Sequence, residues 1–316
     1  MIGNKKMNLV LSLTLLSVSL SAFASNKVIY GIDNRVDVFE STSSKFVKLS
    51  KSTAAMVLNY KIKPINSYEV ELSGMTLEDS GVCKSEKFSQ QPTVANCSGF
   101  LVDKNKLVTA GHCIEDATDC ANNSWVFDYK VDYSDQGKVI VDKSKVYKCK
   151  KIISRDLNTT TKNDYALIEL EEVVTDREPL KFRKTGKAKV GDKLVVIGHP
   201  SGLPSKIADG AKIRSTGSVF FNANLDTYGG NSGSAVFNAT TGVIEGILVR
   251  GDQDYKWDSA LGCKVSNVIA SDAGRGEDVT LITNIKELAS ISSGTQAPPK
   301  PDYSHLPAWL RRWLGL

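Results

Sequence analysis

From Ala54 onward the sequence alternates between short β-rich runs and clusters of turn residues, and this pattern constrains the fold more than any other feature. The runs that show it most clearly cover residues 68–72, 99–102, 125–127, 146–153, 165–170, 193–197, 218–221, 243–249 and 279–282. Many short strands joined by polar turns are typical of antiparallel barrels and sandwiches. We therefore expect an all-β protein, in which helices are few.

The composition limits the function classes that the chain can serve. Its 316 residues are 41% hydrophobic and 24% charged, which is ordinary for a soluble globular protein and argues against both disorder and a membrane bundle. The formal net charge is only +5, and no basic block is interleaved with aromatic residues. We therefore expect no nucleic-acid partner. No pattern indicates a cofactor site, and we expect no cofactor.

The N-terminus predicts export. Lys5 and Lys6 precede an apolar stretch from Leu9 to about Leu20, and Ala22-Phe23-Ala24 has the small-x-small pattern that signal peptidase cuts. The alternative is an uncleaved membrane anchor, but the stretch contains serines and is short for a span of about 20 residues. Residues 1–24 are thus predicted to be a signal peptide, and the protein to be secreted or periplasmic.

The cysteine content fits an exported protein. An even number of cysteines in such a chain indicates disulfides. The six cysteines are Cys83, Cys97, Cys113, Cys120, Cys149 and Cys263. A zinc site is the competing interpretation, but no CxxC pair occurs and the only histidines are His112, His199 and His305. Because these cysteines and histidines do not have the spacing of metal ligands, we expect no metal site.

Three segments carry the residue types of nucleophilic catalysis. His112 lies in Thr109–Cys113 after a β-rich run, Asp164 precedes an apolar run, and Ser232 lies in the glycine-rich turn 229–234. A serine nucleophile needs a base, a carboxylate that orients the base, and N–H donors for the oxyanion. Taken singly, the three could be a packed histidine, a strand cap and a hairpin turn. Together they predict a catalytic triad, with the N–H groups of Gly230 and Ser232 as the oxyanion hole.

The order His, Asp, Ser excludes two common hydrolase classes. The α/β-hydrolases place serine first and subtilisins place aspartate first. With Thr109-Ala110-Gly111-His112-Cys113, Asp164-Tyr165-Ala166-Leu167 and Gly230-Asn231-Ser232-Gly233-Ser234, the sequence resembles the trypsin/chymotrypsin family. It is most similar to the bacterial branch that includes glutamyl endopeptidases, because the serine motif has the GNSGS form. Val28-Ile29-Tyr30-Gly31 also resembles a mature N-terminus of this branch, and 198–200 resembles one of its strand ends.

The resemblance implies a fold and an activity. Residues 28–292 are expected to form two six-stranded antiparallel β-barrels, at about 54–172 and 190–292, with the triad between them and a short C-terminal helix over 285–291. The implied activity is that of a monomeric secreted serine endopeptidase that hydrolyses protein or peptide substrates through an acyl-enzyme. A cut after Lys27 would remove residues 25–27 as a short propeptide. Trypsin-type zymogens have aspartate where this chain has Asn231, so an ion pair with the new terminus cannot form here.

The family pattern also places a disulfide beside the catalytic histidine. Cys97 and Cys113 match that pattern, so we expect a Cys97–Cys113 bridge. The remaining four cysteines allow three pairings, which the sequence does not decide. We favour Cys120–Cys149 together with Cys83–Cys263.

The resemblance places three residues around the S1 pocket, which binds the side chain before the scissile bond. They are Asp226, six residues before Ser232, then Thr227 and Gly251. An aspartate at the base of this pocket favours cleavage after Arg or Lys, unless Asp226 is a solvated strand-end residue. Glutamyl endopeptidases line the pocket with a histidine where this chain has Leu248. A glutamyl-specific endopeptidase and a catalytically silent homologue that acts as a binding module remain the alternatives.

The C-terminal segment differs in composition from the rest of the chain. Residues 293–316 join a proline-rich linker to a stretch rich in Trp, Leu and Arg, which predicts docking to a membrane surface or a partner. The equally weighted alternative is a strap that packs on the protease itself. His305 lies in this segment and His199 directly precedes a proline, so neither is expected to be the catalytic base.

Overall fold

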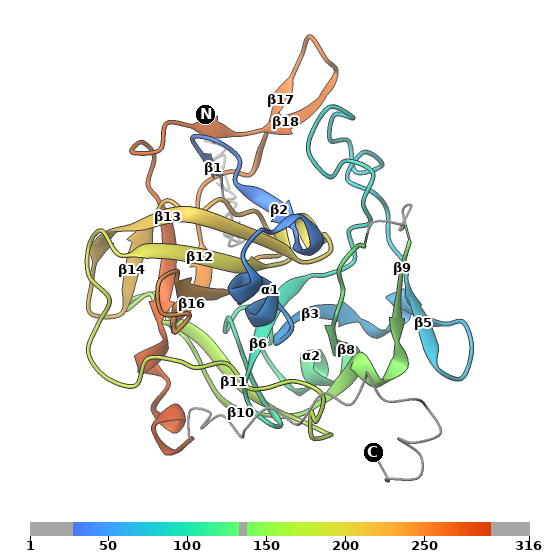
Figure 1. Ribbon diagram of the computed structural model, residues 1–316, viewed down its shortest axis with the longest axis vertical. Helices are drawn as coiled ribbons and strands as arrows, with labels where there is room; N and C mark the ends of the chain where they lie inside the picture. Colours follow the sequence, from blue (N-terminus) through green and yellow to red (C-terminus); the bar gives the residue numbers. More distant parts are fainter. Residues whose placement is uncertain (1–27, 133–137, 292–316) are drawn as a thin grey trace, which may run out of the picture.

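The computed structural model describes residues 28–132 and 138–291 (Figure 1). The expected signal peptide at 1–24, the propeptide at 25–27 and the tail at 293–316 lie outside the described residues, so these three assignments stay predictions. Within the described part, strands predominate and the few helices are short. No helix there is long and apolar enough to cross a membrane.

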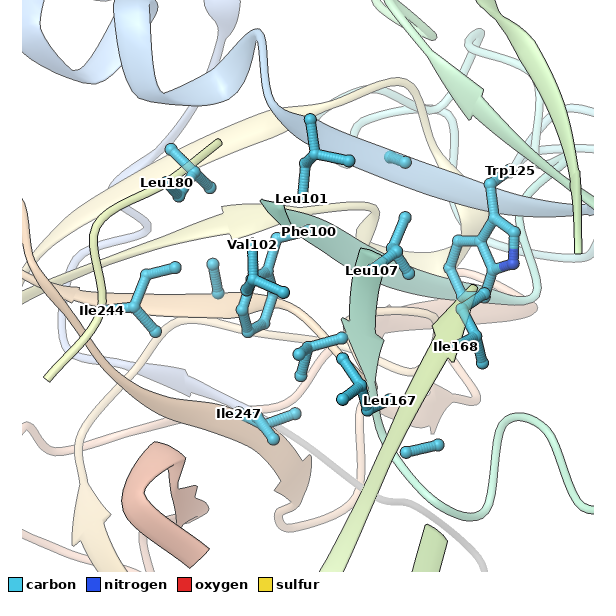
Figure 2. Packing of buried hydrophobic residues seen from close by; sticks show 14 of the residues in the cluster. Phe100, Leu101, Val102, Leu107, Trp125, Leu167, Ile168, Leu180, Ile244 and Ile247 are labelled. Carbon is cyan, nitrogen blue, oxygen red and sulfur yellow. The ribbon is translucent and has the colours of Figure 1, made fainter. Parts of the chain in front are cut away.

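Six strands of the N-terminal half close into a barrel. In chain order they are β3 (Thr53–Leu58), β6 (Cys97–Asp103), β7 (Lys106–Thr109), β8 (Asn123–Phe127), β10 (Val146–Leu157) and β11 (Asp164–Leu170). The ring runs β10-β11-β7-β6-β3-β8, and every neighbouring pair is antiparallel. Large apolar side chains such as Phe100, Trp125 and Leu167 are completely buried in its core (Figure 2).

A second ring of six strands follows in the C-terminal half. Its strands are β12 (Lys193–Gly198), β13 (Lys206–Thr216), β14 (Phe220–Ala223), β15 (Ala235–Asn238), β16 (Ile244–Arg250) and β20 (Glu277–Leu281). The order β12-β15-β16-β20-β14-β13 closes because β12 also pairs with β13. β2 (Arg35–Asp37) adds to β13 from outside the ring. The expected pair of six-stranded antiparallel barrels is confirmed.

The two barrels pack against each other through alternating side chains. Successive residues of a strand point to opposite faces, and β16 shows the consequence. Ile247 belongs to the apolar cluster that contains Phe100 and Val102 of the first barrel, as Figure 2 shows. Leu248, the next residue, belongs to the apolar cluster inside the second barrel. β16 therefore contributes both to the contact between the two barrels and to the core of the second barrel.

The remaining elements are short. They are β1 (Ile29–Tyr30), which pairs with β19 (Val268–Ile269), the sheet of β4 (Ile62–Pro64), β5 (Glu69–Leu72) and β9 (Val139–Asp142), and the hairpin of β17 (Tyr255–Asp258) and β18 (Cys263–Ser266). The helices α1 (Ser44–Ser50) and α2 (Ala117–Asn122) are capped by Ser43 and Asp116. The expected terminal helix is present as a 3-10 helix, η6 (Lys286–Ser290).

All six cysteines are paired, and the pairing is the favoured one. The bridges are Cys97–Cys113, Cys120–Cys149 and Cys83–Cys263. The second joins α2 to β10, and the third joins the loop after β5 to β18. Sequence separations of 16, 29 and 180 residues mean that local and distant parts of the chain are both cross-linked.

Candidate active site

His112 and Asp164 meet at one edge of the first barrel, where one strand ends and its neighbour begins. His112 lies in the turn after β7, and Asp164 is the first residue of β11, the antiparallel neighbour of β7. Asp164 Oδ2 lies 2.8 Å from His112 Nδ1, and Asp164 Oδ1 accepts the backbone N–H of His112 at 3.1 Å. An ionised carboxylate can only accept, so Nδ1 carries the hydrogen and Nε2 offers a lone pair. The pair therefore has the tautomer that a general base requires.

A residue of the second barrel approaches the same carboxylate. Asp164 is only 1% exposed, and burial of a carboxylate is costly unless it is paired. Arg250, at the end of β16, places Nη1 3.5 Å from Asp164 Oδ2 and donates from Nη2 to the carbonyl oxygen of Lys162 at 2.8 Å. Asp164 is thus held by groups of both barrels. Sequence reasoning missed Arg250, because only the packing of the two barrels against each other brings residue 250 to residue 164.

Ser232 is anchored to β6, the strand that is also cross-linked to the histidine loop. It lies in the buried turn between β14 and β15, where its carbonyl oxygen accepts the N–H of Ser98 at 2.8 Å. The hydroxyl of Ser98 donates to the carbonyl of Gly230 at 2.8 Å. Cys97, the neighbour of Ser98 on β6, forms the disulfide with Cys113, the neighbour of His112. Two adjacent residues of β6 therefore hold the histidine and serine loops next to each other.

The backbone of the serine loop requires glycine at position 230. Gly230 has φ +86°, a conformation that residues with a side chain rarely adopt. A Cβ atom there would also lie 2.5 Å from the carbonyl oxygen of His199. The glycine therefore allows the turn to pass closely over the end of β12. The assignment of the Gly230 and Ser232 N–H groups as the oxyanion hole stays a prediction.

Asp226 is buried rather than solvated. Its Oδ1 accepts the backbone N–H of Tyr30 at 2.7 Å, and its Oδ2 accepts that of Asn34 at 3.0 Å. Burial raises the pKa of Asp226 to about 6, although the two backbone hydrogen bonds oppose this. The carboxylate thus binds the N-terminal segment of the described chain. Its expected role in substrate binding stays a prediction.

The two other residues expected around the S1 pocket both contact Glu277. The hydroxyl of Thr227 donates to Glu277 Oε2 at 2.9 Å. A Cβ atom at Gly251 would lie 2.0 Å from the same oxygen, so the glycine backbone passes directly beside the carboxylate. Glu277 is the first residue of β20 and has no exposed surface. Sequence reasoning missed this residue, for which the one available signal was an acidic pair at the start of an apolar strand.

Two other polar residues named in the sequence analysis, His199 and Asn231, are buried and bind neighbouring groups of the protein. His199 is buried, and its Nδ1 lies 3.0 Å from the carbonyl oxygen of Leu203. Burial lowers the pKa of His199 to about 3, so the ring is neutral at physiological pH. Asn231 is buried too, and its side-chain oxygen accepts the hydroxyl of Ser234 at 3.1 Å. His305 lies outside the described residues.

No metal is assigned to the site. Within 28–132 and 138–291, the one group of ligand atoms close enough to share a metal ion is Cys97, His112 and Cys113. Both sulfur atoms belong to the Cys97–Cys113 disulfide and cannot act as thiolate ligands. The cysteines therefore support the histidine loop structurally.

The Cys97–Cys113 bridge gives a testable prediction. We expect Cys97→Ala/Cys113→Ala to lower the free energy of unfolding by about 3 kcal/mol. Without the bridge, the unfolded chain regains the conformational entropy that closing a loop of this length removes. It should also lower peptide hydrolysis, since the histidine loop loses its attachment to β6. Urea denaturation and kcat/KM check the two effects.

The matched control is Cys120→Ala/Cys149→Ala, which removes a bridge of separation 29 at α2. We expect a similar loss of stability with hydrolysis largely retained. Equal losses of hydrolysis in both folded variants would contradict the role given to Cys97–Cys113.

Comparison with known proteins agrees with this fold. Residues 97–247 match the family model of the trypsin-like peptidase domain. The chain therefore has the fold of a trypsin-like serine protease. The resemblance inferred from the sequence is confirmed.

The solved structures that resemble this chain share little sequence identity with it. One is a Glu endopeptidase in complex with MPD, with 14% identity and a TM-score of 0.47 over 83% of this chain and 97% of that chain. Another is Rv3671c from M. tuberculosis H37Rv in an inactive form, with 13% identity and a TM-score of 0.43 over 86% of this chain and 100% of that chain. A search of the curated proteins finds no match.

Proposed function

We propose that the protein is an exported serine endopeptidase that uses His112, Asp164 and Ser232 as a catalytic triad. One observation carries the proposal: Asp164 Oδ2 lies 2.8 Å from His112 Nδ1, beside the loop that presents the serine. A carboxylate in this position holds the imidazole in the reactive tautomer and stabilises the imidazolium that forms during reaction. The substrates are proteins or peptides.

The proposed reaction proceeds through an acyl-enzyme. Ser232 Oγ attacks the carbonyl carbon of the scissile bond while His112 Nε2 takes the hydroxyl proton. The carbonyl oxygen becomes an oxyanion, which accepts hydrogen bonds from the N–H groups of Gly230 and Ser232. The intermediate collapses as the imidazolium returns the proton to the leaving amine. Water then attacks the acyl-enzyme by the same steps, with His112 again as the base, and the peptide acid is released.

The proposal includes export to an oxidising compartment. Disulfides persist outside the cytosol, and the described residues contain three of them with no free cysteine. The signal-like segment at 1–24 supports the same compartment. The tail at 293–316 is proposed as a docking segment for a membrane surface or a partner.

Maturation gives a second prediction. We expect an intermediate that begins at Ser25 and a mature protein that begins at Val28, because Val28-Ile29-Tyr30-Gly31 resembles a mature terminus. N-terminal sequencing of the secreted wild type and of Ser232→Ala checks this. A Val28 terminus in both excludes obligatory self-processing. A fully active enzyme that keeps Ser25 shows that the cut after Lys27 is unnecessary.

For specificity we propose cleavage after Arg or Lys. Asp226 and Glu277 are both buried near Thr227, so a glutamate side chain entering this region would meet like charge. Leu248, which stands where glutamyl endopeptidases have a histidine, belongs to the apolar cluster of the second barrel and offers no donor. Glutamyl specificity and a silent, binding-only homologue are the two alternatives.

Two measurements on purified wild type decide between these activities. Mass spectrometry of products from a mixed-sequence peptide library gives the residue before each cut. Labelling with a serine-directed phosphonate reports an activated serine independently of specificity. Cuts after Glu would support the glutamyl alternative. Failure both to cut and to label would support the binding-only homologue and contradict our proposal.

A further inference from the structure

An extra residue in β16 turns the side chain of Arg250 out of the second barrel. Leu248 stands opposite Val279 of β20, and Arg250 stands opposite Asp278, so β16 advances two residues where β20 advances one. Such a bulge bends the strand and re-aims the side chain that follows it. With regular alternation, Arg250 would share the face of Leu248, which points into the core of the second barrel. Its guanidinium instead reaches Asp164 of the first barrel.

The guanidinium of Arg250 contacts residues of both barrels. In the first barrel, Nη1 lies 3.5 Å from Asp164 Oδ2, and Nη2 donates to the carbonyl oxygen of Lys162 at 2.8 Å. Lys162 lies two residues before Asp164, in the segment between β10 and β11. In the second barrel, Nε lies 3.4 Å from Asp278 Oδ2. The planar group is therefore fixed on the side of the second barrel and holds both Asp164 and the segment that leads to it.

Arg250 approaches the carboxylate oxygen that the base uses. Asp164 Oδ2 is the atom that lies 2.8 Å from His112 Nδ1, whereas Oδ1 accepts the backbone N–H of His112. The carboxylate is only 1% exposed, and a buried charge is costly without a charged partner. A guanidinium is always charged and donates in a fixed plane, so it can both compensate and orient Asp164.

β16 is also attached to the loop that carries Ser232. The N–H of Gly233, the residue after Ser232, donates to the carbonyl oxygen of Leu248 at 2.8 Å. Two residues further along β16, the side chain of Arg250 contacts Asp164. One strand of the second barrel thus connects the loop of the proposed nucleophile with the acid of the first barrel.

We propose that Arg250 is a positioning residue, whose guanidinium holds Asp164 in the orientation that binds His112. The inference rests on the proposed endopeptidase activity and adds a residue that sets its rate. The triad is divided between two barrels, and a misplacement of reacting groups by about 1 Å can cost about a hundredfold in rate. Arg250 keeps the acid aligned with the barrel that carries Ser232. It acts through Asp164 and exchanges no proton itself.

The test is Arg250→Met, which keeps a long side chain and removes the charge and the donors. We expect kcat for one library-derived peptide to fall about 30-fold, the effect of losing a hydrogen bond to a charged group. The rate of labelling by a serine-directed phosphonate should fall in parallel. The matched control is Arg275→Gln, which removes an arginine that pairs with Asp278 at 2.6 Å and has no known contact with Asp164. Its kcat and labelling rate should stay within about threefold of wild type.

Two further measurements separate positioning from general support of the fold. Arg250→Lys keeps the charge without the planar fork, so it should lose less kcat than Arg250→Met. In an Asp164→Asn background, Arg250→Met should lower kcat less than about threefold, because the carboxylate through which Arg250 acts is already gone. Urea denaturation shows which variants are folded. If Arg250→Met does not fold, Arg250→Gln is measured in its place with the same expected loss.

Three results would overturn the inference. They are wild-type kcat and labelling in folded Arg250→Met, equal losses in Arg250→Met and Arg250→Lys, and a loss from Arg250→Met that is undiminished in the Asp164→Asn background. In each case the wild type still hydrolyses peptides and reacts with the phosphonate, so the endopeptidase activity itself stands. Absence of labelling and of all hydrolysis in wild type would instead remove the proposed function, and with it the role of Arg250.

Discussion

Ser232→Ala is expected to lower kcat for peptide hydrolysis by about 10⁶-fold, because it removes the atom that forms the acyl-enzyme. The fold should be retained. The backbone carbonyl of Ser232, which accepts the N–H of Ser98 at 2.8 Å, is unchanged by the substitution. Hydrolysis of a library-derived peptide and labelling by a serine-directed phosphonate measure the loss, and urea denaturation shows that the variant is folded.

The same loop offers a matched control. Ser234 is buried two residues further on, and its hydroxyl donates to Asn231 rather than toward the histidine loop. Ser234→Ala should therefore keep hydrolysis within about tenfold of wild type, since it loses one ordinary hydrogen bond. Full hydrolysis by a folded, protease-free Ser232→Ala preparation would show that another residue is the nucleophile. A loss in Ser234→Ala as large as in Ser232→Ala would show that both act through loop structure.

The barrels could be predicted from the sequence because their strands leave a local pattern. Short apolar runs such as Tyr165–Leu170 are bounded by turn residues, and the structure places them in β-strands. The helices α1 and α2 were not anticipated. Each has only one or two turns and depends on a cap, Ser43 or Asp116, more than on an apolar period. The terminal helix was expected, but its 3-10 geometry has no comparable sequence signal.

The candidate site was predicted only where its residues belong to motifs. His112, Asp164 and Ser232 each stand in a recognisable segment, and the structure brings the first two into contact. Arg250 and Glu277 stand in ordinary strand sequence. Arg250 reaches Asp164 because the two barrels pack against each other, and Glu277 lies beside Gly251 because β16 and β20 are neighbours in the second barrel. Such packing and pairing join residues that are far apart in the chain, and single-sequence patterns do not encode them.

Asp226 shows the same limit of sequence-based prediction for a residue that was identified from the sequence. Its distance of six residues from Ser232 placed it at the base of the S1 pocket, and nothing in the sequence indicated a competing partner. In the structure the backbone N–H groups of Tyr30 and Asn34, almost two hundred residues earlier, bind both of its oxygens. Spacing along the chain fixes where a residue lies in a loop, but not which other segment packs against that loop.

Asp164→Asn is expected to lower kcat by about 10⁴-fold near neutral pH. The carboxylate accepts both from His112 Nδ1, at 2.8 Å, and from the backbone N–H of His112, at 3.1 Å. An asparagine has one accepting atom and one donating group, so it cannot satisfy both contacts in the same way. If its amide donates to Nδ1, the hydrogen of the neutral ring moves to Nε2, which then cannot take the proton of Ser232.

The measurement is kcat for one peptide across a pH series, with Asp156→Asn as the matched control. Asp156 lies on β10 opposite Tyr165, next to Asp164 in the strand pairing, and accepts from Asn163 at 2.7 Å. Because it touches neither His112 nor Ser232 through a known contact, its replacement should change kcat only a few-fold. A loss of less than about tenfold in Asp164→Asn, with wild-type stability, would mean that the contact between Asp164 and His112 is structural and that another group orients the base.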